Sequence, residues 1–168
     1  MVEIVTGHLL DHPLYSGIAD FIAANGIYQR TTVDYFAAQN GCFAAALDGE
    51  KVVGTSLNFD AKNSDFLRQN LSAYLDQAGI PISTCVTPAC IYLDPTYSGQ
   101  KIGDSLSVAK SQHSLSDGYE YTVLWGYETQ AIFDYSTRIG NLIDTGVDDQ
   151  KGFRVYLRKL EDVISALT

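Results

Sequence analysis

The order of apolar and polar positions along the chain predicts a fold that mixes helices and strands. Runs of β-branched and apolar residues indicate strands, whereas apolar residues spaced three and four apart indicate amphipathic helices. The predicted strands are residues 2–6, 42–47, 51–59, 82–93, 119–127, 142–145 and 153–160. The predicted helices are residues 14–22, 33–39, 64–79, 102–116 and 130–139.

Polar residues at the ends of these segments predict where the segments begin. Asp11 is the predicted cap of the first helix, with Pro13 in its first turn, and Thr31 or Thr32 is the predicted cap of the second. The pair Asp48-Gly49 predicts a tight hairpin turn between two strands. Local signals of this kind set the limits of each element before any long-range contact is considered.

The succession of elements predicts an α/β fold with one mixed sheet and helices on both faces. The strand–helix–strand run over residues 82–127 predicts a parallel crossover in the centre of that sheet. The final residues, 165–168, are predicted to fray. No linker or internal repeat interrupts the succession, so a single domain over residues 1–168 is expected.

The balance of charge restricts the partners of the chain. The 168 residues carry a net charge of −9 and have a pI near 4.5. Such a charge repels nucleic acid and anionic membranes, and it attracts a cationic molecule such as an amine. Solubility alone, or a salty habitat, would explain the same acidity.

Cysteine usage and hydropathy favour a cytoplasmic protein. The three cysteines (Cys42, Cys85 and Cys90) are odd in number and lack metal-site spacing, which is typical of buried reduced thiols. The sequence contains no run of roughly 18 apolar residues, so no membrane span is predicted. Its N-terminus has no basic segment followed by an apolar one, so no signal peptide is predicted. His8 and His12 flank no acidic cluster, so no metal site is predicted.

One stretch has the pattern of a phosphate-binding device. A buried strand over residues 89–93 runs through a glycine-containing loop, residues 94–101, into a helix that starts near Ile102. The backbone N–H groups at the start of a helix have no intrahelical partner, and the helix dipole adds partial positive charge there. The stretch therefore predicts a site for a phosphate group at the start of this helix.

Three motifs in this order resemble those of the GCN5-related N-acetyltransferase (GNAT) superfamily, over roughly residues 2–160. The motifs are ALDGEKVVGTSLNF at 46–59, YLDPTYSGQKIGDSL at 92–106 and TQAIFDYSTRIGN at 129–141. The resemblance implies a mostly antiparallel GNAT-like sheet. It also implies transfer of an acetyl group from acetyl-coenzyme A (acetyl-CoA) directly to an amine. The cofactor-binding residues that it implies are Ile91, Tyr92, Leu93, Ser98, Gly99, Gln100, Lys101, Ile102, Gly103 and Asp104.

The loop departs from the family pattern, which usually has Arg or Gln first and Gly in the middle. Here Ser98 takes the first position and Lys101 the middle one, while Gly103 keeps its type. Glycine allows a phosphate to approach the backbone closely and permits unusual backbone angles. Lys101 gives up part of that freedom but offers an ammonium to a phosphate, so it either helps by charge or obstructs by bulk.

The resemblance also implies where catalytic groups lie. Tyr135 is the favoured proton donor to the departing thiolate, with Ser136 as the alternative position one residue later. Glu128 stands where the family often has Asn and is the candidate base, or else an acid that interacts with a helix dipole. The backbone N–H groups of residues 91–93 would stabilise the negative charge that develops on the thioester oxygen.

The sequence as a whole predicts an acetyl-CoA-dependent N-acetyltransferase for a small, cationic amine. The alternative is a non-catalytic CoA-binding or protein-interaction module on a degenerate GNAT fold, in which the central strands would pair along their full length. A weaker option is transfer of a longer acyl group, or transfer to a protein N-terminus. The helix at 64–79 would shape an acceptor pocket, form a homodimer face, or simply cover the sheet.

Overall fold

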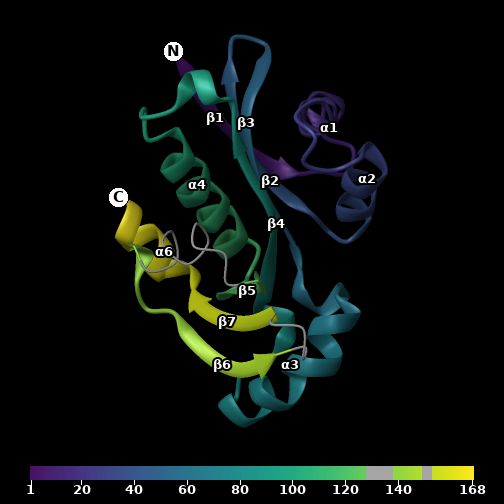
Figure 1. Cartoon of the computed structure of the whole chain (residues 1–168), viewed down its shortest axis with the longest axis vertical. Coiled ribbons are helices and arrows are strands. Elements are labelled where there is room, and N and C mark those ends of the chain that lie inside the picture. The colour runs from purple at the N-terminus through teal and green to yellow at the C-terminus, as the bar shows by residue number, and fades with distance from the viewer. Residues whose placement is uncertain (128–137, 149–152) are drawn as a thin grey trace. The chain divides into compact units, whose positions relative to one another are not determined.

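A computed structural model describes residues 1–127, 138–148 and 153–168 of the chain (Figure 1). The strands are β1 (Val2–His8), β2 (Cys42–Asp48), β3 (Lys51–Asp60), β4 (Cys85–Leu93), β5 (Tyr121–Tyr127), β6 (Ile143–Asp148) and β7 (Phe153–Lys159). The α-helices are α1 (Tyr15–Ala24), α2 (Arg30–Ala38), α3 (Asp65–Ala78), α4 (Ile102–Ser116) and α6 (Leu160–Leu167). Short 3₁₀ turns η1, η2 and η3 cover Ala61–Asn63, Ile82–Thr84 and Pro95–Tyr97.

The strands follow the hydrogen-bonded order β1-β2-β3-β4-β5-β7-β6. The pairs β1–β2, β2–β3, β5–β7 and β6–β7 are antiparallel, whereas β4 and β5 are parallel and are joined through α4. The predicted mixed, mostly antiparallel sheet with a central parallel crossover is therefore confirmed.

The described chain forms two compact units. The first unit contains residues 1–59 and 88–113, and the second contains residues 60–87 and 114–168. Strand β4 changes unit between Thr87 and Pro88, and α4 changes unit near its C-terminal end.

In the first unit, helices cover both faces of the β1–β3 strands (Figure 1). Alternate residues of β2 point to opposite faces, as the pleat of a strand requires. Phe43 and Ala45 pack with the buried residues of α1 and α2, whereas Ala44 and Ala46 pack with α4. This double coverage explains why β2 is a continuous apolar run rather than an alternating one.

In the second unit, α3 provides one apolar layer. Leu67, Leu71 and Leu75 recur at helical spacing and pack with residues of β4, β5 and β7, including Val123 and Val155. The predicted limits of this helix are confirmed, because the Ser64 hydroxyl accepts from the Leu67 N–H and Gly79 ends the helix at φ 69°. A smaller apolar cluster contains Val86, Tyr119 and Leu160.

Two predicted helix caps and one predicted terminus are wrong. The residue before α1 is Leu14 and not Asp11, whose φ is 61°, so Pro13 precedes the helix instead of lying in its first turn. The residue before α2 is Gln29, and its side chain makes no cap hydrogen bond. The last residues form α6 instead of fraying, because Leu160 and Val163 are buried. An N-cap contributes about 1 kcal/mol, which is small beside the burial of several apolar side chains.

Among the described residues, no helix is both long and apolar enough to cross a membrane.

Candidate functional site

The loop between β4 and α4 is anchored at its first residue, Asp94. The Asp94 carboxylate accepts hydrogen bonds from the Thr96 backbone N–H at 3.0 Å and from the Thr96 hydroxyl at 2.7 Å. These hydrogen bonds, with a contribution from Lys51, hold the pKa of Asp94 below its ordinary value. A carboxylate that accepts two hydrogen bonds from the chain just ahead of it fixes a tight turn, which here is η3.

The β2–β3 hairpin holds the other side of the loop. The Tyr97 hydroxyl donates to an Asp48 carboxylate oxygen at 2.7 Å, and Lys51 lies 3.8 Å from the second oxygen of Asp94. The Asp94 backbone N–H donates to the Val53 carbonyl at 2.8 Å. The loop is therefore attached to the hairpin before it reaches α4.

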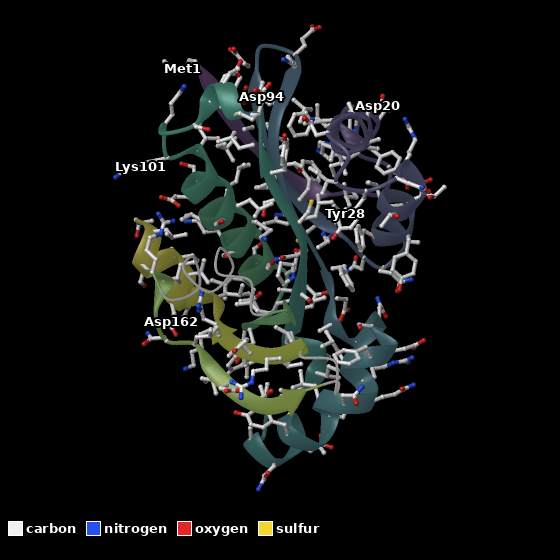
Figure 2. All side chains as sticks on the ribbon, viewed as in Figure 1. Met1, Asp20, Tyr28, Asp94, Lys101 and Asp162 are labelled. Atoms are coloured by element: carbon white, nitrogen blue, oxygen red, sulfur yellow. The ribbon has the colours of Figure 1, made fainter. Side chains whose placement is uncertain are left out.

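The segment just before α4 has an unusual backbone and an open face. Gly99 has φ 79° and Lys101 has φ 58°, so two of three consecutive residues adopt left-handed conformations. The family pattern places glycine where Lys101 stands, and the lysine keeps the backbone conformation that glycine would favour, at a cost of about 1 kcal/mol. The Lys101 side chain is exposed and extends away from the ribbon (Figure 2).

A ligand can approach the backbone closely here. An added Cβ at Gly99 or Gly103 would meet no atom within 4 Å. The Ser105 N–H donates to the Lys101 carbonyl at 3.0 Å. The N–H groups of Ile102 and Gly103 lie nearer the start of the helix than this hydrogen bond. Backbone donors and the dipole at this helix start suit a phosphate group, although Asp104 adds a negative charge in the same first turn.

The apolar side of α4 holds this helix start in place. Leu106 is fully buried and Ile102 is 7% exposed, and both pack with Ala44, Ala46 and Val53. Gly54 is required for this packing, because a Cβ there would lie 2.9 Å from a Leu93 methyl and 3.2 Å from a Leu106 methyl.

The structure brings the predicted cofactor residues together within the first unit. Leu93 packs in the α4 cluster, and the ring of Tyr92 lies 5.7 Å from that of Phe21. Ile91 is exposed, as are Ser98 and Gln100. Their assignment to cofactor binding stays a prediction.

The predicted catalytic residues lie outside the described residues. Tyr135, the alternative Ser136 and the candidate base Glu128 all fall in the segment 128–137. Their roles also stay predictions.

The pairing of β4 with β5 bears on the alternative of a non-catalytic module. The ladder contains Cys85↔Tyr121 and Val86↔Thr122, and the Thr87 hydroxyl then donates to the Val123 carbonyl at 2.9 Å. These contacts all lie within the second unit. Whether the rest of the two strands is paired or splayed stays a prediction.

Sequence reasoning missed a buried lysine on α4. Lys110 is 8% exposed and follows Leu106 by four residues on the same helix face. Burial lowers the pKa of the Lys110 ammonium to about 8, and the neighbouring Cys42 and Cys90 oppose this shift. The spacing of Ile102, Leu106 and Lys110 was the available signal.

Cys42 and Cys85 are buried as predicted, whereas Cys90 is only half-buried. Burial raises the pKa of this thiol to about 11, and the nearby Lys110 only partly opposes that shift. A thiol with such a pKa is a poor nucleophile near neutral pH.

Solved structures share this fold. The CoA-dependent acyl-homoserine lactone synthase MesI matches with a TM-score of 0.68 and 14% identity, over 98% of this chain and 93% of that one. The CoA-dependent synthase BjaI, solved with SAM and isopentyl-CoA, matches with a TM-score of 0.67 and 12% identity, over 99% of this chain and 88% of that one. A GNAT-family acetyltransferase from Staphylococcus aureus matches with a TM-score of 0.60 and 15% identity, over 95% of this chain and 99% of that one.

No family model matches the sequence, and no curated protein matches it either. At these identities the similarity concerns the fold. The chain has the GNAT-like fold that GNAT acetyltransferases and acyl-homoserine lactone synthases share, which confirms the resemblance at this level.

Proposed function

We propose that this protein is a CoA-dependent acyltransferase that moves an acyl group from acyl-CoA to an amine. The observation that carries the proposal is the open backbone at Gly99, just before α4, and at Gly103, in its first turn, after a loop that the β2–β3 hairpin holds in place.

Acetyl-CoA is the proposed donor, and a small cationic amine is the proposed acceptor. The net charge of −9 supports the charge of the acceptor. Backbone N–H groups of Ile91–Leu93 would stabilise the developing oxyanion, Glu128 would accept the amine proton and Tyr135 would protonate the thiolate. A Tyr135→Phe variant that binds acetyl-CoA normally but releases thiol slowly would support that assignment.

Titration calorimetry with acetyl-CoA tests the site directly. We expect a dissociation constant on the order of 1 µM to 1 mM. Gly103→Val should weaken binding by roughly tenfold or more without unfolding the protein, because its side chain enters open space over the helix start. Gln112→Val is the control, since it places the same side chain at an exposed position of the same helix.

A thiol-release assay with a panel of amines separates the enzyme from the binding module. Release that depends on an amine supports the acyltransferase. CoA binding without release under any acceptor supports the module, and no binding at millimolar acetyl-CoA overturns the site.

A longer acyl group is the second candidate, and the comparisons favour its inclusion. The TM-scores to the acyl-homoserine lactone synthases are 0.67 and 0.68, against 0.60 for the Staphylococcus aureus acetyltransferase. Rates of thiol release with acyl donors from acetyl to decanoyl decide between the two. A maximum at acetyl supports the first candidate, and a maximum at a longer chain supports the second.

A further inference from the structure

The residue pair that closes the β2–β3 hairpin faces the loop before α4. Asp48 and Lys51 lie directly opposite one another in the register of the two strands, so their side chains share one face of the hairpin. The Asp48 carboxylate accepts from the Tyr97 hydroxyl at 2.7 Å, and the Lys51 ammonium lies 3.8 Å from a carboxylate oxygen of Asp94. All four residues belong to the first unit.

The side chain of Tyr97 is held along its whole length. Its ring packs against the apolar cluster of α4, and its hydroxyl reaches Asp48. The next four residues, Ser98 to Lys101, are exposed, and the backbone is left-handed at Gly99 and Lys101. Tyr97 is therefore the side chain that fixes the chain just before this exposed segment, while α4 fixes it just after.

The carboxylate of Asp48 is unsuited to direct contact with a phosphate, because two negative charges repel each other. Its hydrogen bond gives it another use. That bond raises the pKa of Tyr97 above its ordinary value, so the hydroxyl keeps its proton and continues to donate at neutral pH. Asp48 can therefore act on a bound anion only through the position of Tyr97.

We propose that Asp48 is a positioning residue for the diphosphate of coenzyme A and acts through the Tyr97 hydroxyl. The inference rests on the proposed function, because it concerns the same loop. The hydrogen bond holds the exposed segment ready for the phosphates, so that little order has to be gained on binding. Without the bond, the ligand has to order the segment itself and binds more weakly.

Two substitutions separate the position of the Asp48 side chain from its charge. Asp48→Asn keeps an oxygen that accepts from Tyr97 and removes the charge, so acetyl-CoA should bind equally well or up to roughly threefold more tightly. Asp48→Ala removes the acceptor as well, and binding should weaken by roughly three- to tenfold. If Asp48 acted by charge alone, both variants would bind more tightly.

Titration calorimetry of the full chain with acetyl-CoA measures these affinities. Tyr97→Phe should weaken binding as much as Asp48→Ala does, and the double variant should be no weaker, because the same hydrogen bond is lost in all three. Tyr15→Phe is the matched control, since the Tyr15 hydroxyl donates to Asp34 and the same atom is removed away from the loop. This variant should bind acetyl-CoA like the unaltered chain.

The kinetics of transfer give a second measurement. In Tyr97→Phe the KM for acetyl-CoA should rise while kcat stays within roughly twofold, because the reacting groups are untouched. Equal binding by Tyr97→Phe and the unaltered chain, tighter binding by Asp48→Ala, or losses that add in the double variant would overturn the positioning role and leave the proposed function standing. Failure of the unaltered chain to bind acetyl-CoA would overturn the proposed function and this role with it.

Discussion

The two halves of α4 face the same side of the same strands, yet their chemistry differs. In the apolar half, Ile102 and Leu106 pack with Ala44, Ala46 and Val53. In the polar half, Lys110 lies near Cys42 and Cys90, and the His113 ring lies 5.2 Å from that of His8.

The strand register explains this change along the helix. Ala44 pairs with Ser56, and Cys42 pairs with Asn58, so these side chains share the α4 face. His8 extends the row by pairing with Cys42. The apolar half stabilises the helix start that the proposed function needs, while the polar half places an ammonium, thiols and an imidazole where apolar groups would stabilise the fold more.

Removal of the central side chain of the apolar half should have the largest effect. Leu106→Ala leaves a cavity at a fully buried position and should lower the free energy of unfolding by about 2–5 kcal/mol. Denaturant unfolding measures this, with Ser105→Ala as an exposed control. A loss below about 1 kcal/mol would mean that α4 does not depend on this packing.

Replacement of the buried ammonium in the polar half should raise the free energy of unfolding, opposite to the effect of Leu106→Ala. The fall in the pKa of Lys110 from 10.5 to about 8 corresponds to a cost of about 3 kcal/mol in the folded state. Lys110→Met should therefore raise the free energy of unfolding at pH 7 by up to about that amount, as measured by denaturant unfolding.

The pH dependence of that gain identifies its cause. Below pH 8 the lysine is charged in both states, so the full cost is present. Between pH 8 and 10.5 the unfolded chain holds the proton longer than the folded chain, so the folded state recovers stability as the pH rises. The gain from Lys110→Met should therefore shrink over this range. Lys159→Met, at an exposed site, should show no such trend.

Substitution of Lys101 should show how its side chain affects acetyl-CoA binding and how its backbone conformation affects the free energy of unfolding. Lys101→Gly removes a left-handed lysine and should change the free energy of unfolding by less than about 1 kcal/mol, because the relieved strain is offset by greater freedom of the unfolded chain. Lys101→Ala removes the ammonium and the rest of the side chain but keeps a Cβ at this left-handed position. If the ammonium contacts the cofactor, both variants should weaken acetyl-CoA binding; if the side chain obstructs, both should strengthen it.

The smallest effect is expected at Ser56 in the polar half. Its hydroxyl is fully buried and has no hydrogen-bond partner among the described residues, so Ser56→Ala should be neutral or stabilise the fold by up to about 1 kcal/mol. Thr55→Val is the matched control, because the Thr55 hydroxyl donates to the Ala44 carbonyl at 3.3 Å and its loss should destabilise. Thermal unfolding of both variants checks the difference in sign.

Most elements of the fold were predictable from periodicity, because burial on one or two faces leaves a repeating pattern in the sequence. The α3 helix shows this well, since Ser64, a leucine stripe and Gly79 all agree. The caps of α1 and α2 were not predictable, because tertiary packing outweighed the nearby Asp11 and Thr31.

The candidate site was predictable only in part. The strand, loop and helix order pointed to a phosphate site at residues 98–103, and the anchoring loop residue Asp94 lay within the recognised motif. The anchoring role of Asp48 and the burial of Lys110 were not predictable, because each depends on which strand lies beside the loop or beneath the helix.

The sequence by itself determined where the chain is helical or extended, and it determined the loop that opens α4. These features depend on neighbours within a few residues, whose spacing the sequence displays directly. Only the tertiary structure decided that Tyr97 reaches Asp48, that Lys110 is buried beside Cys42 and Cys90, and that His8 meets His113. Those contacts depend on strand register and on helix docking, which arise when distant segments bury their apolar faces together.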